Sequence, residues 1–194
     1  MDKMEVMMNI MIVGVGGQGT LLASRILGAA ALRAGKQVKL SEVHGMSQRG
    51  GSVVTYVKYG DRVASPVIEQ GEADMIIAFE ELEAYRSLPY LKKGGVMIVN
   101  TQKTNPMPVI TGAMEYPADI LETMKEKGVN VVACDALALA KEAGNIKSVN
   151  VALIGVMAKN SPLSKEIWEG ALEDAVPAKF LEVNQKAFAL GYNH

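Results

Sequence analysis

The fold is decided by the stretch Val13-Gly-Val-Gly-Gly-Gln-Gly-Thr20. It continues the apolar run Val6–Val15, which indicates a buried strand, and turns tightly within Gly14–Gly19. Gln18–Ala34 follows with residues that favour a helix ending at a glycine. Because Gln37–Leu40 then forms another short apolar run, we predict a strand, a helix and a strand that make a parallel pair.

The rest of the chain continues the alternation of strands and helices. We expect Ser52–Lys58 to be one strand of a hairpin that turns at Tyr59-Gly60-Asp61 into Arg62–Ala64. Further buried strands are predicted at Met75–Phe79, Val96–Asn100 and Val129–Ala133. Helices are predicted at Ala118–Lys127, Ala136–Ala143, Lys147–Lys159, Pro162–Ala175 and Ala178–Leu190. The pattern predicts a three-layer α/β fold with a mainly parallel central sheet, a hairpin insertion and a helical C-terminal third, within a single domain of residues 1–194.

The composition limits the classes of partner and compartment. The 194 residues are 49% hydrophobic and 21% charged, with a net charge of −1 and no basic block, so we expect neither nucleic acid nor a membrane surface as a partner. The start of the chain lacks the basic front of a signal peptide, and the apolar run Val149–Ala158 is too short to span a bilayer. We therefore expect a cytoplasmic protein. Cys134 is the only cysteine, which indicates a buried thiol and no metal or iron–sulfur site on this chain.

The glycine turn has two interpretations. Gly14, Gly16 and Gly19 fit the dinucleotide fingerprint G-x-G-x-x-G, with Gly17 and Gln18 between them, and the turn lies between a strand and a helix as that fingerprint requires. Glu42 follows Gly19 by 23 residues, where an acid binds a ribose hydroxyl in Rossmann folds. This favours a stand-alone dinucleotide-binding oxidoreductase. The alternative is that the glycines only allow a helix to pack closely on a strand.

The segment Glu42–Val53 is the most unusual part of the sequence. It places polar and charged side chains between glycines after the second predicted strand, where ligands of open α/β sheets gather. The candidate residues for a substrate-binding or interface site are Glu42, His44, Ser47, Gln48 and Arg49. An arginine in such a place can bind a carboxylate or phosphate through two parallel bonds, and a histidine can hydrogen-bond a carbonyl or move a proton. The alternative is a surface loop whose polar groups satisfy one another.

These two motifs together resemble a known family. Gly14–Thr20 and Ser41–Val53 are similar to the gamma-type domain of the 2-oxoacid:ferredoxin oxidoreductases, and Glu42–Gly51 is most similar to the small subunits of the indolepyruvate branch. Shorter matches occur at Ala78–Ala84, Leu88–Leu91, Val99–Thr101 and Asn150–Gly155. The long polar segment is specific to the family, whereas the glycine turn alone is not.

The resemblance implies a division of labour between subunits. The family converts a 2-oxoacid, coenzyme A and oxidised ferredoxin into an acyl-CoA, CO2 and reduced ferredoxin, using thiamine diphosphate and iron–sulfur clusters. The sequence has a single cysteine, and its nearest match to a thiamine motif, Gly60-Asp61-Arg62, departs from the Gly-Asp-Gly pattern. We therefore expect this chain to bind no cofactor itself and to need a large subunit that carries both, with ferredoxin and coenzyme A as partners of the complex. Aryl pyruvates such as indolepyruvate are the implied substrates.

Two further residues have open roles in the sequence. Glu80 follows a predicted strand and either complements the dipole of the next helix or lies at the same edge of the sheet as Glu42. Asn150 begins an apolar helix, so if it is buried it needs a hydrogen-bond partner in a neighbouring loop.

Overall fold

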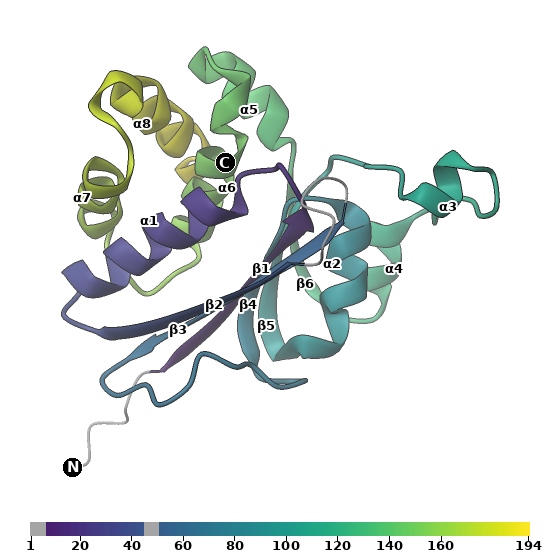
Figure 1. Ribbon diagram of the computed structural model, residues 1–194, viewed down its shortest axis with the longest axis horizontal. Helices are drawn as coiled ribbons and strands as arrows, with labels where there is room; N and C mark the ends of the chain where they lie inside the picture. Colours follow the sequence, from purple (N-terminus) through teal and green to yellow (C-terminus); the bar gives the residue numbers. More distant parts are fainter. Residues whose placement is uncertain (1–6, 45–50) are drawn as a thin grey trace.

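The structure is a computed structural model that describes residues 7–44 and 51–194. Its described part forms one six-stranded sheet in the order β2-β3-β1-β4-β5-β6 (Figure 1). The strands are β1 (Met8–Val15), β2 (Gln37–His44), β3 (Ser52–Gly60), β4 (Ala73–Ala78), β5 (Leu91–Asn100) and β6 (Asn130–Cys134). β1, β4, β5 and β6 pair in parallel, and β3 pairs antiparallel with both β1 and β2. The predicted α/β class with a mainly parallel sheet is confirmed.

Helices cover both faces of the sheet, which makes three layers (Figure 1). One face carries α1 (Thr20–Arg33), α5 (Ala136–Ala143), α6 (Val149–Lys159), α7 (Lys165–Ala175) and α8 (Ala178–Tyr192). The other carries α2 (Glu81–Ser87) and α4 (Ile120–Glu126), while α3 (Met107–Ile110) lies away from the sheet. Short 3-10 turns, Leu88–Tyr90 and Ile146–Ser148, precede β5 and α6.

The apolar runs of the sequence are buried because they lie at the centre of these layers. In β1, Ile10 and Ile12 pack under α1 and α6, whereas Met11 and Val13 face α2 and α4, so the strand is apolar on both sides. The apolar helix α6 is buried along nearly its whole length and packs closely on α8. A side chain at Gly191 would come within 1.9 Å of the carbonyl oxygen of Ala152, which explains the glycine there. Among the described residues, no helix is long and apolar enough to cross a membrane.

The strand pairing departs from two predictions. The expected neighbouring pair β1–β2 is wrong, because β3 lies between these strands and hydrogen-bonds to both. The hairpin is also placed differently, since it joins β2 to β3 across the segment that the sequence indicated as a loop. β3 does not turn at Tyr59, because Gly60 is still paired with Gln37, and Arg62–Ala64 is not a strand. As a result Glu42 and His44 lie in β2 rather than in a loop.

Candidate functional site

The glycine turn lies at the carboxyl end of β1 and is closed by its own glutamine. The side-chain oxygen of Gln18 accepts from the amide of Val15 at 2.7 Å, and the amide of Gln18 donates to the carbonyl oxygen of Val15 at 3.2 Å. Gly17 and Gly19 adopt φ values of 101° and 85°, in the left-handed region that favours glycine. The turn therefore holds a fixed shape, and α1 begins directly after it.

Close packing accounts for two other constraints in this turn. A side chain at Gly14 would come within 2.7 Å of the oxygen of Gln18 and 3.0 Å of Cβ of Phe79. One at Gly19 would come within 2.6 Å of the side-chain nitrogen of Asn150. The structural interpretation of the motif thus explains Gly14, Gly17 and Gly19 without a nucleotide.

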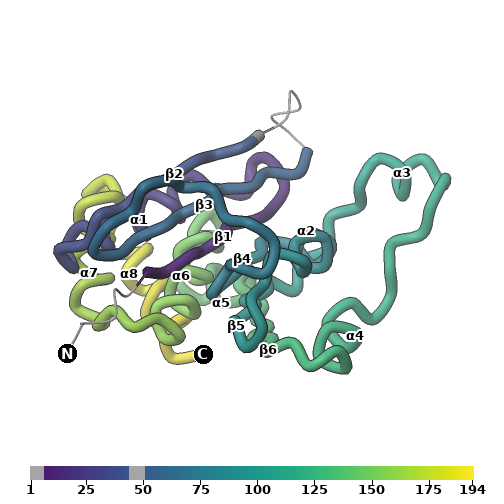
Figure 2. The backbone as a smooth tube through the Cα atoms, turned by 90° about the horizontal axis from the view of Figure 1, so that it is seen from below, coloured from purple at the N-terminus to yellow at the C-terminus, as the bar shows by residue number. Residues whose placement is uncertain are grey.

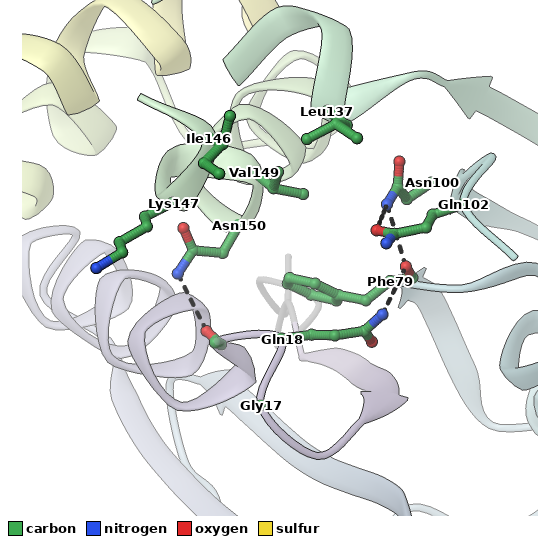
Figure 3. Close-up of a pocket in the computed structure, with 11 residues that line it drawn as sticks. Gly17, Gln18, Phe79, Asn100, Gln102, Leu137, Ile146, Lys147, Val149 and Asn150 are labelled. Atoms are coloured by element: carbon green, nitrogen blue, oxygen red, sulfur yellow. Dashed lines mark hydrogen bonds between the residues drawn. The ribbon is translucent and has the colours of Figure 1, made fainter. Parts of the chain in front are cut away.

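A set of amide side chains connects the ends of three neighbouring strands. The carbonyl oxygen of Phe79, just after β4, accepts from Gln18 at 3.4 Å and from Asn100 at 3.1 Å (Figure 3). Asn100, which ends β5 and is 1% exposed, also accepts from the amide of Ala136 at the start of α5, at 3.1 Å. We did not identify Asn100 as a site residue from the sequence. The only indication was a polar residue at the end of an apolar strand.

Asn150 confirms the expectation of a partner in a neighbouring loop. Its side-chain nitrogen donates to the carbonyl oxygen of Gly19 at 3.2 Å, so the start of α6 is tied to the glycine turn (Figure 3). Asn150 is 6% exposed.

These side chains line a cavity of about 460 Å³ at the carboxyl edge of the sheet. Figure 3 shows Gln18, Phe79 and Asn100 on one side and Leu137, Val149 and Asn150 on the other. Ile146 and Lys147 also line the cavity; both are exposed, and Lys147 forms no ion pair with any described residue. The cavity combines neutral hydrogen-bonding groups, apolar contacts and one cation, which suits a polar organic ligand.

A second cavity, of about 380 Å³, lies on the other side of the glycine turn. Its lining includes Gly16, Gly17, Gly19 and Glu42, so the structure brings together the glycine turn and the acid that the sequence singled out. The amide of Gly16 also donates to the carbonyl oxygen of Gly51 at 2.9 Å, at the end of the polar segment. His44 ends β2, where its backbone is in register with Val53. Ser47, Gln48 and Arg49 lie outside the described residues, and their site roles stay predictions.

The position of Glu42 differs from that of the acid in a Rossmann fold. There the second strand is adjacent to the first, and its acid lies directly beside the glycine turn. Here β3 lies between β1 and β2, so the end of β2 is ~10 Å from β1, or two strand spacings instead of one. The geometry therefore disfavours the dinucleotide interpretation.

Glu80 is buried and caps α2, at the same carboxyl edge of the sheet where β2, which carries Glu42, also ends. Its carboxylate accepts from the amide of Glu83 at 3.0 Å and so caps the helix. It also accepts from the amide of Thr104 at 3.0 Å and from the hydroxyl of Tyr116. Burial, together with this bond to a carboxylate, raises the pKa of Tyr116 far above its ordinary value. Burial also raises the pKa of neighbouring Glu81, partly offset by Lys103.

Cys134 is 2% exposed at the end of β6, as expected of a small buried side chain. Burial, with a smaller effect of Asp135, raises the pKa of its thiol to about 12, so it is not a reactive thiolate. Within residues 7–44 and 51–194, no group of three or more His, Cys, Asp and Glu side chains is arranged to hold a metal ion.

Comparison with known proteins identifies the family. The model of the pyruvate ferredoxin/flavodoxin oxidoreductase family matches residues 9–194. The chain belongs to this family. The indolepyruvate oxidoreductase subunit IorB of Thermococcus kodakarensis is 46% identical over 188 residues, covering 94% of this chain and 93% of that protein. The common gamma subunit of the pyruvate/ketoisovalerate oxidoreductases of the same organism is 28% identical, covering 96% of each.

Solved structures of the family share the fold. The gamma subunit of a keto/oxoacid ferredoxin oxidoreductase from Geobacter sulfurreducens superposes with a TM-score of 0.71 at 28% identity, covering 96% of both chains. The 2-oxoglutarate:ferredoxin oxidoreductase of Magnetococcus marinus, with a TM-score of 0.72 at 21% identity, covers 96% of this chain but only 30% of its own. The same fold thus occurs both as a separate subunit and as part of a longer chain.

Proposed function

We propose that this chain is the small subunit of a 2-oxoacid:ferredoxin oxidoreductase that acts on aryl pyruvates such as indolepyruvate. The observation that carries the proposal is the similarity to indolepyruvate oxidoreductase subunits along nearly the whole chain, 46% against 28% for the pyruvate/ketoisovalerate subunit. The overall reaction consumes a 2-oxoacid, coenzyme A and two oxidised ferredoxins and yields an acyl-CoA, CO2, a proton and two reduced ferredoxins.

The cofactors are assigned to a separate large subunit. Thiamine diphosphate supplies the carbon nucleophile for decarboxylation and iron–sulfur clusters supply the path for electrons, and this chain has one cysteine, which is buried. The residues of this chain are proposed to complete the active site that it shares with the large subunit and to shield that site from solvent. We place the complex in the cytoplasm, where reducing conditions keep a lone thiol free.

The edge at the carboxyl ends of the strands is the proposed contact with the large subunit. It combines the glycine turn, Glu42 and both cavities, and it is the edge where β2 ends at His44 and β3 begins at Ser52. Within that segment Arg49 is proposed to contact an anion, either the carboxylate of the 2-oxoacid or a phosphate of coenzyme A.

Co-expression tests the proposal. The partner is the large subunit encoded in the same genome, recognised by thiamine-binding and ferredoxin-like cysteine motifs. The two chains should copurify and reduce ferredoxin or a viologen dye with indolepyruvate and coenzyme A, and turnover with pyruvate should be much slower. A chain that stays free beside a folded, cofactor-loaded large subunit would refute the assignment.

A further inference from the structure

The segment between β5 and α4 projects from the body of the molecule as an arm. We use this name for residues 102–118, which carry α3 near their tip. Figures 1 and 2, at right angles to each other, both show it extending well beyond the sheet and its covering helices.

The base of the arm is fastened by a buried carboxylate. Glu80, 1% exposed, accepts from the amide of Thr104 on the outgoing stem and from the hydroxyl of Tyr116 on the returning stem. The same hydroxyl accepts from the amide of Leu82 at 3.1 Å. Because a buried carboxylate without partners is costly, these bonds fix both stems to the start of α2.

The tip is held in shape by its own backbone. The carbonyl oxygen of Pro106 accepts from the amide of Ile110 at 3.0 Å, and that of Pro108 accepts from the amide of Ala113 at 2.9 Å. Each proline also fixes a backbone angle. The tip is therefore formed before any partner binds, which reduces the entropy lost on binding.

The surface of the tip is apolar and uncharged. Met107, Ile110 and Met114 are 67%, 64% and 63% exposed. Residues 105–114, Asn-Pro-Met-Pro-Val-Ile-Thr-Gly-Ala-Met, include no charged side chain, although 21% of the whole chain is charged. Exposed apolar groups gathered in one place mark an interaction site, and the lack of charge fits the core of a protein interface, where charged residues are scarce.

The arm lies on the same side as the proposed contact edge. Met107 and Ile110 line a hollow of about 200 Å³ together with Val15, at the end of β1, and Ser52, at the start of β3. Val15 leads into the glycine turn, and Ser52 immediately follows Gly51 at the end of the polar segment. A partner seated on that edge therefore also meets the arm.

We infer that the arm docks into an uncharged, apolar groove of the large subunit, with Met107, Ile110 and Met114 as the inserted side chains. This inference rests on the proposed function, because it takes the large subunit as the occupant. The hollow at the root of the arm extends the contact back to the strand ends.

The test measures the affinity of purified variants for the large subunit. Ile110→Glu and Met114→Glu place a charge in the groove and should weaken binding by about ten- to a hundredfold, as expected for the loss of a buried apolar side chain. Leu32→Glu is the matched control, because Leu32 is 62% exposed near the end of α1. It should bind like the wild type. All three isolated chains should melt like the wild type, since these side chains are already in water.

Each outcome separates the inference from the proposed function. If the wild type and Leu32→Glu bind and the arm variants bind equally well, the inference is overturned and the function stands. If the wild type itself does not bind the large subunit, the proposed function fails and the inference with it. If the isolated wild type is a dimer that Ile110→Glu converts to a monomer, with affinity for the large subunit unchanged, the occupant is a second copy and the inference is again overturned.

Discussion

Asn150 and Gly19, 131 positions apart in the sequence, are joined by a side-chain hydrogen bond of 3.2 Å. The bond connects the first turn of α6 to the residue that precedes α1, and Gly19 lines both cavities at the carboxyl edge of the sheet. The absence of a side chain at Gly19 allows this approach, because a Cβ there would lie 2.6 Å from the donor nitrogen. The glycine turn is therefore shaped as much by α6 as by its own backbone.

Asn150→Ala should lower the free energy of unfolding by about 1–2 kcal/mol, because it removes a partly buried hydrogen bond and leaves the carbonyl oxygen of Gly19 with only the amide of Ala23 as a donor. For a chain of this size the melting temperature should fall by about 2–8 °C. Asn193→Ala, at an exposed position with no side-chain hydrogen bond within the described structure, is the control and should melt like the wild type. Equal melting of the two variants would show that the bond contributes nothing.

Gly17→Ala and Gly19→Ala separate backbone strain from close packing. Both glycines have positive φ, so each substitution should cost about 1–2 kcal/mol in backbone strain. At Gly17 the added Cβ meets no atom within 4 Å, whereas at Gly19 it meets Asn150. Gly19→Ala should therefore be clearly the more destabilising in urea unfolding, and Asn150→Ala in the same chain should relieve part of the excess. Equal losses at the two positions would contradict this account of the turn.

The local part of the fold was predictable because it depends on neighbours in the sequence. The strand, glycine turn and helix from Met8 to Arg33 follow from hydrophobic runs and turn chemistry, and the helix ends near Gly35 as predicted. The polar segment Glu42–Val53 indicated the family through its resemblance to the small subunits of the indolepyruvate branch. Glu42 does lie at a cavity with the glycine turn.

The predictions that were wrong or left open concern contacts between segments that are distant in the sequence. The sequence of β3 does not state which strands it pairs with, and its insertion between β1 and β2 is decided by tertiary pairing. Glu80 was equally ambiguous, because its role depends on Thr104 and Tyr116, which approach it only when the arm folds back. Asn100 lines the first cavity because it is held there by hydrogen bonds with Phe79 and with the start of α5, which the sequence does not bring together.

Tyr59→Phe should stabilise the protein by about 1 kcal/mol near neutral pH. Tyr59 is 1% exposed, and its hydroxyl has no hydrogen-bond partner in the described part of the chain, so its removal relieves a buried polar group. Burial, with a smaller effect of Asp74, raises the pKa of Tyr59 from 10.0 to about 12. The folded protein therefore holds the phenol proton more tightly than the unfolded chain does. This contribution to the free energy of unfolding is fully present below about pH 10 and is lost as the pH rises towards 12.

Urea midpoints at pH 8 and pH 11 check both parts of this prediction. The urea midpoint of Tyr59→Phe should be higher than that of the wild type at pH 8, and the difference should be larger at pH 11. Tyr85→Phe, at an exposed tyrosine, should match the wild type at pH 8 and serves as the control. A destabilised Tyr59→Phe at pH 8 would mean that the hydroxyl has a partner after all.

The isolated chain should not bind NAD, NADP or FAD at micromolar concentrations, because β3 separates Glu42 from the position that a ribose requires. Isothermal titration with each nucleotide measures this directly. Micromolar binding that Glu42→Ala and Gly16→Val both abolish would instead favour a stand-alone dinucleotide enzyme. Binding that neither variant changes would place the ligand elsewhere.

Arg49 gives the sharpest test of the polar segment. It is the only fixed positive charge between Glu42 and Val53, in a segment that begins and ends at the proposed contact edge. In a partly dry interface each bond from its guanidinium to an anion is worth about 1.5–3 kcal/mol. Arg49→Ala in the assembled complex should therefore raise KM by roughly ten- to a hundredfold for one substrate, either the 2-oxoacid or coenzyme A.

Steady-state kinetics with the two substrates varied separately decide which anion Arg49 contacts. Arg49→Lys keeps the charge but loses the planar pair of donors, so it should recover only part of the loss. Arg25→Ala, on the exposed side of α1, is the matched control and should leave both KM values unchanged. If Arg49→Ala leaves both KM values and kcat as in the wild type, Arg49 has no contact with substrate. Its charge would then be satisfied by a carboxylate of the protein, as the simpler interpretation of the segment holds.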